Sequence, residues 1–365
     1  MPAVITKGPP SSTASRVIID CDPGIDDMMA LCVALSPLSR SKIAVEAITI
    51  VFGNSDEIET LARNARYALE LCGVDGVPVV IGAHGPIVGD YRGHGGKRVH
   101  GGGAVGGIIL PVDDAAAPPC AKKAKSENAA ARLMVDMCLA SPGEISIITL
   151  GPMTNLAAAL ALDPAFAPAV KSVFCMAGSC GNPMGNAWAA AEANVGNDPH
   201  AAKAVFNDPH LTTTMAGLHL THQLDLAPLR ARMIAPDAND ACKFLHAISR
   251  HYVDILTGWG QVDIPVHDPT AVLALIEPGL FTGIRSHVDV EVEGTVAQGA
   301  TIADWNGHWR AARKEASAAA GAADVDDRVN VLTAVDIPAF NEAFMAALAA
   351  IPWEASAAER ASWQP

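Results

Sequence analysis

Short apolar runs alternate along the chain with segments whose apolar residues recur at helical spacing. Runs of strand type occupy residues 17–19, 43–51, 77–81, 145–150, 170–177, 212–216 and 286–292. Helical spacing occupies residues 26–35, 58–71, 127–140, 153–162, 199–206, 239–257, 269–276 and 337–350. This alternation favours an α/β fold, a single Rossmann-like domain with a mostly parallel central sheet and helices on both faces.

The two ends of the chain and two internal segments depart from this rhythm. Residues 1–15 are rich in Pro, Ser and Thr and are expected to form a disordered tail, and residues 353–365 a C-terminal tail. Insertions are expected near 113–125, which is rich in Ala, Pro and Lys, and near 311–327, which is rich in Ala. The folded domain is therefore expected to span residues 16–352.

Composition narrows the class of protein. Half of the 365 residues are hydrophobic, so a sizeable core can form, and the formal net charge of -14 argues against nucleic acid or an anionic membrane as a partner. No apolar run reaches the ~18 residues of a membrane span, and the N-terminus lacks the apolar core of a signal peptide. The eight cysteines form no C-x-x-C pair, which favours free thiols in a cytoplasmic protein.

Four carboxylates crowd the end of the first predicted strand. Asp20, Asp22, Asp26 and Asp27 lie within eight residues of one another. Strand ends of this kind open onto the ligand crevice of α/β sheets. Asp26 and Asp27 also suit the first turn of a helix, but that explanation leaves the other two acids without a role. Mutual repulsion predicts a positive partner, and a hard divalent cation is the natural one.

Other polar residues follow later strands. His267 and Asp268 precede a proline, a pattern that suits a helix cap as well as a metal ligand. Glu192 and Asn194 are two residues apart, so in an extended segment they face the same side, and Asn186 lies shortly before them. Such groups offer donors and acceptors to sugar hydroxyls, although a polar loop with Asn in turns explains them equally well.

Three further segments are ambiguous in the same way. Asn54 and Leu150 each lie at a strand end beside a glycine, where backbone can approach a ligand closely or simply turn. The glycine-rich stretch 94–107, which contains His100, matches a dinucleotide-binding pattern only weakly because no strand precedes it. A mobile lid over a site is the better interpretation.

Taken together and in order, these segments resemble the inosine-uridine-preferring nucleoside hydrolase family over roughly residues 15–350. The matching motifs are DCDPGIDD (20–27), FGN (52–54), HGGGAVGG (100–107), LGPMTN (150–155), GNAWAAAEAN (185–194) and HDP (267–269). The resemblance implies the family's fold, a bound Ca²⁺, and cleavage of the N-glycosidic bond of ribonucleosides to ribose and free base.

The resemblance also implies a role for each matching residue. The metal ligands are expected to be Asp22, Asp27, Asp268 and the main-chain carbonyl of Leu150, with Asp20 orienting the metal shell. Asp22 is also expected to be the general base that activates the attacking water. The resemblance further implies contacts to the substrate from Asp26, Asn54, His100, Asn186, Glu192 and Asn194. His267 is expected to protonate the departing base.

Departures from the family pattern bear on the substrate and the lid. The family's purine-specific branch carries Trp at the place of His267, so that branch is disfavoured. The helix 239–257 lacks a clear pair of tyrosines that would reach the base. His219 stands where the family often has Asp, and Gly102, Gly103 and Ala104 stand where the lid often has an acidic residue.

Two other functions fit part of the pattern. A D-x-D phosphotransferase would use Asp20 as nucleophile and Asp22 as acid/base, but leaves the later motifs unexplained. A catalytically inactive, Ca²⁺-dependent nucleoside-binding protein would keep the site without turnover. The partner expected from the resemblance is a small ribonucleoside, and the expected assembly is a homodimer or homotetramer.

Overall fold

The computed structural model describes residues 14–91, 93, 96–108, 110–111, 128–309 and 328–363. The two expected insertions, near 113–125 and 311–327, lie outside the described residues, and so do residues 1–13 of the expected N-terminal tail.

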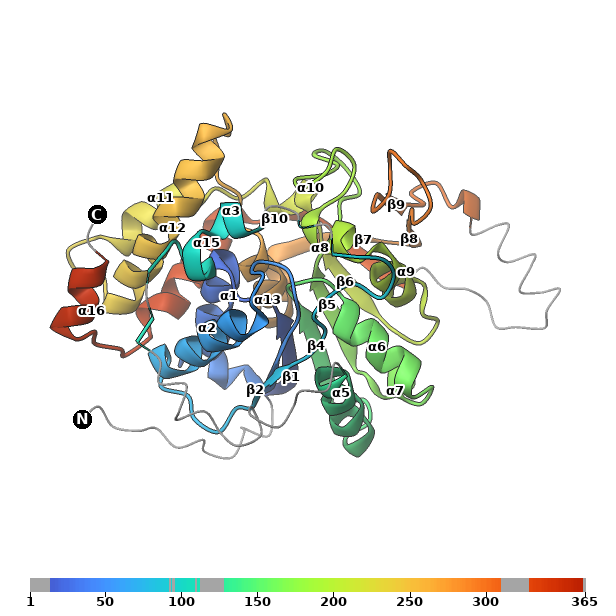
Figure 1. Ribbon diagram of the computed structural model, residues 1–365, viewed down its shortest axis with the longest axis horizontal. Helices are drawn as coiled ribbons and strands as arrows, with labels where there is room; N and C mark the ends of the chain where they lie inside the picture. Colours follow the sequence, from blue (N-terminus) through green and yellow to red (C-terminus); the bar gives the residue numbers. More distant parts are fainter. Residues whose placement is uncertain are drawn as a thin grey trace.

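An eight-stranded sheet forms the centre of the fold, in the order β3-β2-β1-β4-β5-β6-β10-β7 (Figure 1). All neighbours are parallel except β10 and β7. The strands are β1 (Ser15–Cys21), β2 (Ile43–Ile50), β3 (Val79–Ile81), β4 (Ile145–Thr149), β5 (Ser172–Met176), β6 (Thr213–Ala216), β7 (Phe281–Ser286) and β10 (Val329–Val335). The predicted α/β architecture with a mostly parallel sheet is confirmed.

Helices cover both faces of this sheet. One core joins it to α1 (Ile25–Leu35), α2 (Ile58–Leu71), α12 (Asp240–Gly258), α13 (Asp268–Ile276) and α15 (Ile337–Ala349). The other core joins it to α5 (Ala129–Ala140), α6 (Thr154–Leu162) and α9 (Pro199–Asn207). The shorter helices are α3 (Gly96–His100), α7 (Phe166–Ala169), α8 (Ala193–Asn197), α10 (Leu218–Thr221), α11 (Leu226–Met233) and α16 (Ala357–Ser362). Three 3₁₀ turns complete the described elements: Ser39–Ser41, Gly102–Ala104 and Pro278–Leu280.

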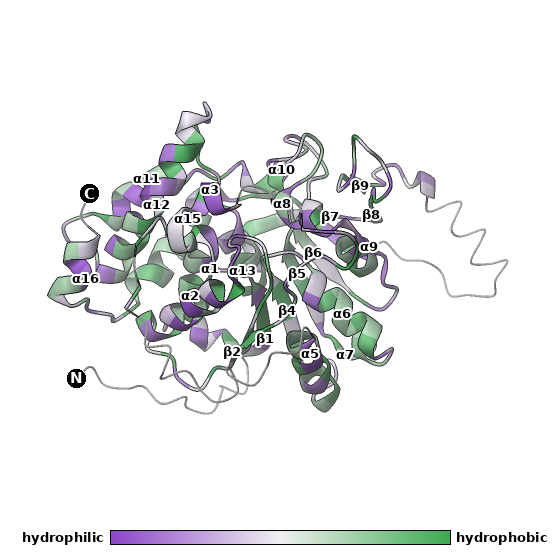
Figure 2. Ribbon diagram, viewed as in Figure 1, coloured by the Kyte–Doolittle hydropathy of each residue, from purple (hydrophilic) through white to green (hydrophobic). Residues whose placement is uncertain are grey.

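Strand β1 shows how the sequence produces these layers. Val17, Ile18 and Ile19 have no exposed surface. Val17 and Ile19 pack into the core that contains α1, whereas Ile18 packs into the core that contains α6. Successive side chains of a strand point to opposite faces, so a continuous apolar run is what a strand covered on both faces requires. Figure 2 shows the hydrophobic residues concentrated in these central strands.

The last third of the chain differs from the prediction. One strand was expected over 286–292, but the chain instead leaves the main sheet after β7 and forms β8 (Val288–Val290), which pairs with β9 (Thr301–Ala303) in a separate two-stranded sheet. Strand β10, which the hydrophobic pattern did not single out, then returns between β6 and β7. A short apolar run such as Val329–Val335 gives no sign of the long-range pairing that makes it a strand.

The expected C-terminal tail is also structured. Residues 353–363 include helix α16 and Trp363, whose side chain is buried. The Trp363 ring lies 5.6 Å from the ring of Phe244 and 5.6 Å from that of Trp353. This aromatic cluster fastens the end of the chain to α12.

Two expectations from composition can be compared with the structure. No helix in the described part of the chain combines the length and the apolar character that crossing a bilayer requires. The seven described cysteines are all free thiols, as expected; Cys120 lies outside the described residues.

Replacing Trp363 with Ala should lower the free energy of unfolding by about 3 kcal/mol, because it removes a large buried aromatic group. Urea titration followed by circular dichroism measures this change. Trp305, which is 44% exposed, gives a matched control, and Trp305→Ala should change stability much less. Equal losses in the two variants would contradict the packing role of the C-terminal segment.

Candidate active site

The candidate site lies at the carboxyl edge of the sheet, where the strand order changes direction. Strand β1 has β2 on one side and β4 on the other, so the connections after β1 and β4 diverge and leave a crevice. Asp22 follows β1, Asn54 follows β2 and Leu150 follows β4. The topology therefore brings together segments that are more than a hundred residues apart in the sequence.

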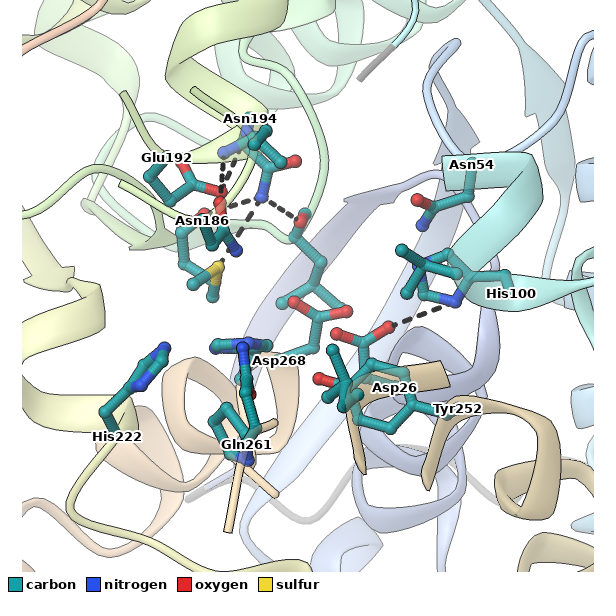
Figure 3. A pocket seen from close by; sticks show the side chains of 18 of the residues that line it. Asp26, Asn54, His100, Asn186, Glu192, Asn194, His222, Tyr252, Gln261 and Asp268 are labelled. Carbon is teal, nitrogen blue, oxygen red and sulfur yellow. Dashed lines mark hydrogen bonds and ion pairs between the residues drawn. The ribbon is translucent and has the colours of Figure 1, made fainter. Parts of the chain in front are cut away.

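A pocket opens above this edge (Figure 3). The predicted site residues that line it are Asp26, Asn54, His100, Leu150, Asn186, Glu192, Asn194, His267 and Asp268. The other predicted residues, Asp20, Asp22 and Asp27, are buried beside the pocket. His222 and Gln261 also line it, and no sequence motif had marked them.

The turn between β1 and α1 holds its acids by backbone hydrogen bonds. Gly24 caps α1, and Asp27 lies in the first helical turn. The two carboxylate oxygens of Asp27 accept hydrogen bonds from the amides of Asp22, at 3.2 Å, and Gly24, at 3.0 Å. The carboxylate thus closes the turn from which it projects, as in other helix caps.

Asn54 ties the end of β2 to this turn. Its amide nitrogen donates to Asp22 Oδ2 at 2.9 Å, and its Nδ2 donates to the Asp22 carbonyl at 3.0 Å and to Asp27 Oδ2 at 3.1 Å. A Cβ on Gly53 would lie 1.9 Å from Asp22 Oδ2, so only glycine leaves room for this approach. Asn54 was predicted to contact the substrate, and here it lines the pocket while it positions two acids.

Asp20 is fixed more deeply. Its Oδ1 accepts hydrogen bonds from Thr49 Oγ1 at 2.6 Å and from Asn155 Nδ2 at 2.8 Å. Burial raises the pKa of Asp20 to about 7, against the opposing effect of these two hydrogen bonds. No role was predicted for Thr49 or Asn155. Each lies inside a regular element, a strand and a helix, and the neighbouring sequence does not show that its side chain contacts Asp20.

The acids from α1 and α13 meet. One ligand atom from each of Asp26, Asp27 and Asp268 lies within 4.8 Å of the others. This group differs from the predicted metal ligands, since it contains Asp26, which was predicted to contact the substrate, and lacks Asp22. The Leu150 carbonyl accepts a hydrogen bond from Asn194 Nδ2 at 2.6 Å and retains a second lone pair.

Burial and mutual repulsion make this cluster a strong attractor for positive charge. Burial, together with the nearby charge of Asp26, raises the pKa of Asp27 to about 7, and burial raises the pKa of Asp26 to about 6. Burial and the neighbouring acids raise the pKa of Asp22 and Asp268 well above the usual range. Among the described residues, no Lys or Arg forms an ion pair with these four carboxylates.

Unpartnered oxygen atoms show that these acids fit a cation. Asp20 Oδ2, Asp22 Oδ1 and Asp26 Oδ1 are buried and have no hydrogen-bond partner within the described part of the chain. A buried carboxylate oxygen that lacks both a donor and a cation is unfavourable. Several hard oxygen donors in one place are the ligand set that Ca²⁺ and Mg²⁺ prefer.

The segment with Glu192 folds differently from the expectation. Glu192 is not in an extended segment beside Asn194 but caps helix α8, and its carboxylate accepts from the amides of Gly178, Asn194 and Val195 at 2.8–3.1 Å. Burial raises its pKa to about 7. Asn186 Oδ1 accepts from the Ala193 amide at 3.0 Å. Figure 3 shows Asn186, Glu192 and Asn194 grouped on one wall of the pocket.

His100 lies against the acids, near the start of α1. Its Nδ1 accepts from the Ile25 amide at 3.0 Å, and its ring stacks on Tyr252 at 6.1 Å. Burial lowers the pKa of His100 to about 3. Its Nδ1 is therefore unprotonated, and the 3.8 Å distance to Asp26 Oδ1 is an approach of neutral imidazole rather than an ion pair.

His267 lines the pocket and lies immediately before Asp268, at the N-cap of α13. Its Nδ1 is 2.8 Å from Thr221 Oγ1, and its ring centroid is 5.5 Å from that of His222. Burial lowers the pKa of His267 to about 3, with smaller contributions from His222 and His100. The imidazole is therefore neutral near pH 7 and faces the pocket it lines.

Comparison with known proteins gives one consistent result. Residues 17–342 match the family described as "Inosine-uridine preferring nucleoside hydrolase". A protein of that name from Crithidia fasciculata is 34% identical over 80% of this chain and 88% of its own length. Uridine nucleosidase 1 of Arabidopsis thaliana is 33% identical over 83% of this chain and 87% of its own length.

Solved structures agree with these sequence matches. A plant nucleoside hydrolase superimposes with a TM-score of 0.75 and 28% identity, covering 93% of this chain and 99% of its own. A purine-preferring ribonucleoside hydrolase from Gardnerella vaginalis superimposes with a TM-score of 0.74 and 28% identity, covering 92% of this chain and 98% of its own.

Adding Ca²⁺ to chelator-treated protein should raise its melting temperature, because a cation relieves the repulsion in the acid cluster. The gain in free energy of unfolding is about 2.7 kcal/mol at 100 times the Kd, and it should be smaller at pH 5 than at pH 8, where fewer protons compete. Differential scanning fluorimetry measures the shift.

Two variants, each of which removes one carboxylate, test where that cation binds. Asp27→Asn should lose most of the shift, whereas Asp289→Asn, which removes an acid paired with Lys203 elsewhere on the surface, should retain it. No shift with Ca²⁺, Mg²⁺ or Mn²⁺ in the unmodified protein would contradict a metal site in the cluster.

Proposed function

Because the chain belongs to the inosine-uridine preferring nucleoside hydrolase family, we propose that it hydrolyses the N-glycosidic bond of ribonucleosides to ribose and free base. The observation that carries the proposal is a single pocket that joins a buried acid cluster, a wall of amide and carboxylate groups, and a neutral imidazole. The first substrates to test are uridine and inosine, for which relatives are named.

The metal that we propose is Ca²⁺, held by Asp22, Asp27, Asp268 and the carbonyl of Leu150, with Asp26 close enough to replace or supplement a ligand. When bound, a hard divalent cation neutralises carboxylates and makes a water ligand more acidic. The unpartnered oxygens Asp22 Oδ1 and Asp26 Oδ1 support this assignment.

Asp22 is the proposed general base. Its Oδ2 is fixed by the Asn54 amide, whereas its Oδ1 has no partner in the described part of the chain. One oxygen is thus anchored and the other is left for the cation, and the same carboxylate would take the proton from the attacking water beside it. Asp20, anchored by Thr49 and Asn155, supports the cluster from beneath.

The carboxylate and amide groups that line the pocket are proposed to bind the ribose. Loss of the base leaves positive charge on the sugar ring, as in glycoside hydrolysis, and fixed negative groups stabilise that charge. The proposed contacts to the ribose are Asp26, Asn54, Asn186, Glu192 and Asn194, and His100 is proposed to lie near the base. Several of these groups already hold backbone atoms, so they are fixed before a substrate arrives.

His267 is proposed to assist departure of the base. The departing base gains electron density on its ring nitrogen and oxygen atoms, and a hydrogen bond from the imidazole Nε2–H relieves it. The neutral state that burial imposes makes His267 a hydrogen-bond donor before any proton moves.

The geometry argues against the phosphotransferase alternative. A nucleophilic Asp20 would need to meet a phosphoryl group, yet Asp20 has no exposed surface and its Oδ1 holds Thr49 and Asn155. We also propose a cytoplasmic location, because the described cysteines are free thiols, and a homodimeric or homotetrameric assembly by analogy with the family. Light scattering in solution measures the assembly.

Release of free base and ribose from a panel of nucleosides, measured by chromatography, tests the function directly. We expect equal amounts of base and ribose from uridine or inosine in the presence of Ca²⁺. Nucleoside binding without release would favour an inactive binding protein and overturn the proposal.

Asp22→Asn should lower kcat by about 100-fold or more, because the amide cannot accept the proton from water. Asp289→Asn provides the control for a surface carboxylate. Measurement with excess Ca²⁺ separates loss of the base from weaker metal binding. Full activity of Asp22→Asn would contradict the assigned role.

His267→Ala should slow natural nucleosides far more than 4-nitrophenyl riboside, whose leaving group departs without a proton. The kcat ratio of the two substrates, compared with the unmodified enzyme, measures the effect. An equal loss on both would remove leaving-group assistance from the mechanism.

A further inference from the structure

Thr221 makes a buried side-chain contact with the imidazole of the site. It ends helix α10, just after β6, and has no exposed surface. Its Oγ1 lies 2.8 Å from Nδ1 of His267, which is 46 residues later in the sequence. The His267 ring lines the pocket, whereas Thr221 does not.

The direction of this hydrogen bond follows from what else surrounds the hydroxyl. Among the described residues, His267 Nδ1 is the one hydrogen-bond partner of Thr221 Oγ1. The carbonyl of Gly217, the usual acceptor for a threonine in a helical turn, already receives the amides of Leu220 at 2.9 Å and Thr221 at 3.1 Å.

If Nδ1 donated to the hydroxyl, the hydroxyl hydrogen would be buried without an acceptor, which is unfavourable. If the hydroxyl donates to Nδ1 instead, both groups are satisfied. The Thr221 hydroxyl is therefore the donor of this hydrogen bond, and Nδ1 of His267 is the acceptor.

That assignment fixes the tautomer of His267. A neutral imidazole that accepts at Nδ1 carries its hydrogen on Nε2. Nε2 is the nitrogen left for the pocket, since Nδ1 is occupied by Thr221 and the His222 ring, whose centroid lies 5.5 Å away, makes no hydrogen bond to His267. The other tautomer would present a lone pair, which cannot assist a leaving base.

We infer that Thr221 is a positioning residue for base departure, because its hydroxyl holds His267 in the orientation and tautomer that present Nε2–H to the pocket. This inference rests on the proposed function. Thr221 does not touch the substrate, so its effect should appear in the chemical step and scale with the need of the base for a hydrogen bond.

Two substitutions at Thr221 test the inference. Thr221→Val keeps the shape and removes the hydroxyl, whereas Thr221→Ser keeps the hydroxyl. We expect Thr221→Val to lower kcat on uridine or inosine by about tenfold or more, within the range of proton-transfer assistance, and to change KM and turnover of 4-nitrophenyl riboside little. Thr221→Ser should recover most of the lost activity.

Thr270→Val is the matched control. Thr270 is also fully buried and lies in the first turn of α13, whose N-cap is His267, but its hydroxyl donates to the carbonyl of Val266 at 2.8 Å rather than to the ring. Its loss should affect both substrates equally. The inference is overturned if Thr221→Val slows both substrates equally, slows neither, or is not rescued by Thr221→Ser.

A second measurement reports the tautomer without turnover. In protein labelled with ¹⁵N-histidine, the His267 signals, assigned by their loss in His267→Asn, should show an unprotonated Nδ1 and a protonated Nε2. Thr221→Val should shift them toward a mixture of tautomers. A protonated Nδ1 in the unmodified protein would overturn the inference.

The failures of this inference and of the proposed function are distinguishable. If the unmodified protein releases no base from any nucleoside or aryl riboside, the proposed function fails, and the inference about base departure fails with it. If the unmodified protein is active but Thr221→Val retains the substrate ratio, only the inference fails.

Discussion

Repulsion among buried carboxylates is the constraint on which this site depends. Asp20, Asp22, Asp26, Asp27 and Asp268 are buried or nearly so, and no Lys or Arg in the described part of the chain pairs with them. Removing such charges from water costs several kcal/mol for each ion unless they are compensated. The chain itself supplies too little positive charge, so the cluster either takes up protons or binds a cation.

The fold concentrates these charges by placing two helix starts beside one strand end. Helices α1 and α13 pack against each other, and both carry acids in the first turn. Their N-termini favour negative charge by up to about 2 kcal/mol each, which offsets only part of the cost of burial. Two glycines leave room for the Asp22 carboxylate. A Cβ on Gly53 would lie 1.9 Å from one Asp22 oxygen, and a Cβ on Gly151 would lie 2.5 Å from the other.

The parts of the site that lie within one short sequence motif were predictable. The contacts between segments that are distant in the sequence were not. The spacing of Asp20, Asp22 and Asp27 after an apolar strand was sufficient to predict acids at the sheet edge. The capping role of Glu192 was not readable, because an E-x-N segment suits a strand as well as a helix start. The bond between Thr221 and His267 joins segments 46 residues apart, and no local pattern records such a contact.

The contacts of His219 also join segments that are distant in the sequence. It replaces an acid common in the family, and its ring joins the Cys180 amide, at 3.2 Å, to the Leu332 carbonyl, at 3.0 Å. A neutral imidazole with one acceptor and one donor satisfies both, so the substitution keeps the loop after β5 attached to β10.

The most direct test of the account is a crystal structure of the protein grown with Mn²⁺, examined for anomalous scattering. One strong peak is expected among the carboxylates of Asp22, Asp27 and Asp268. A map without a peak there, with those side chains hydrogen-bonded to one another as protonated acids, would contradict it.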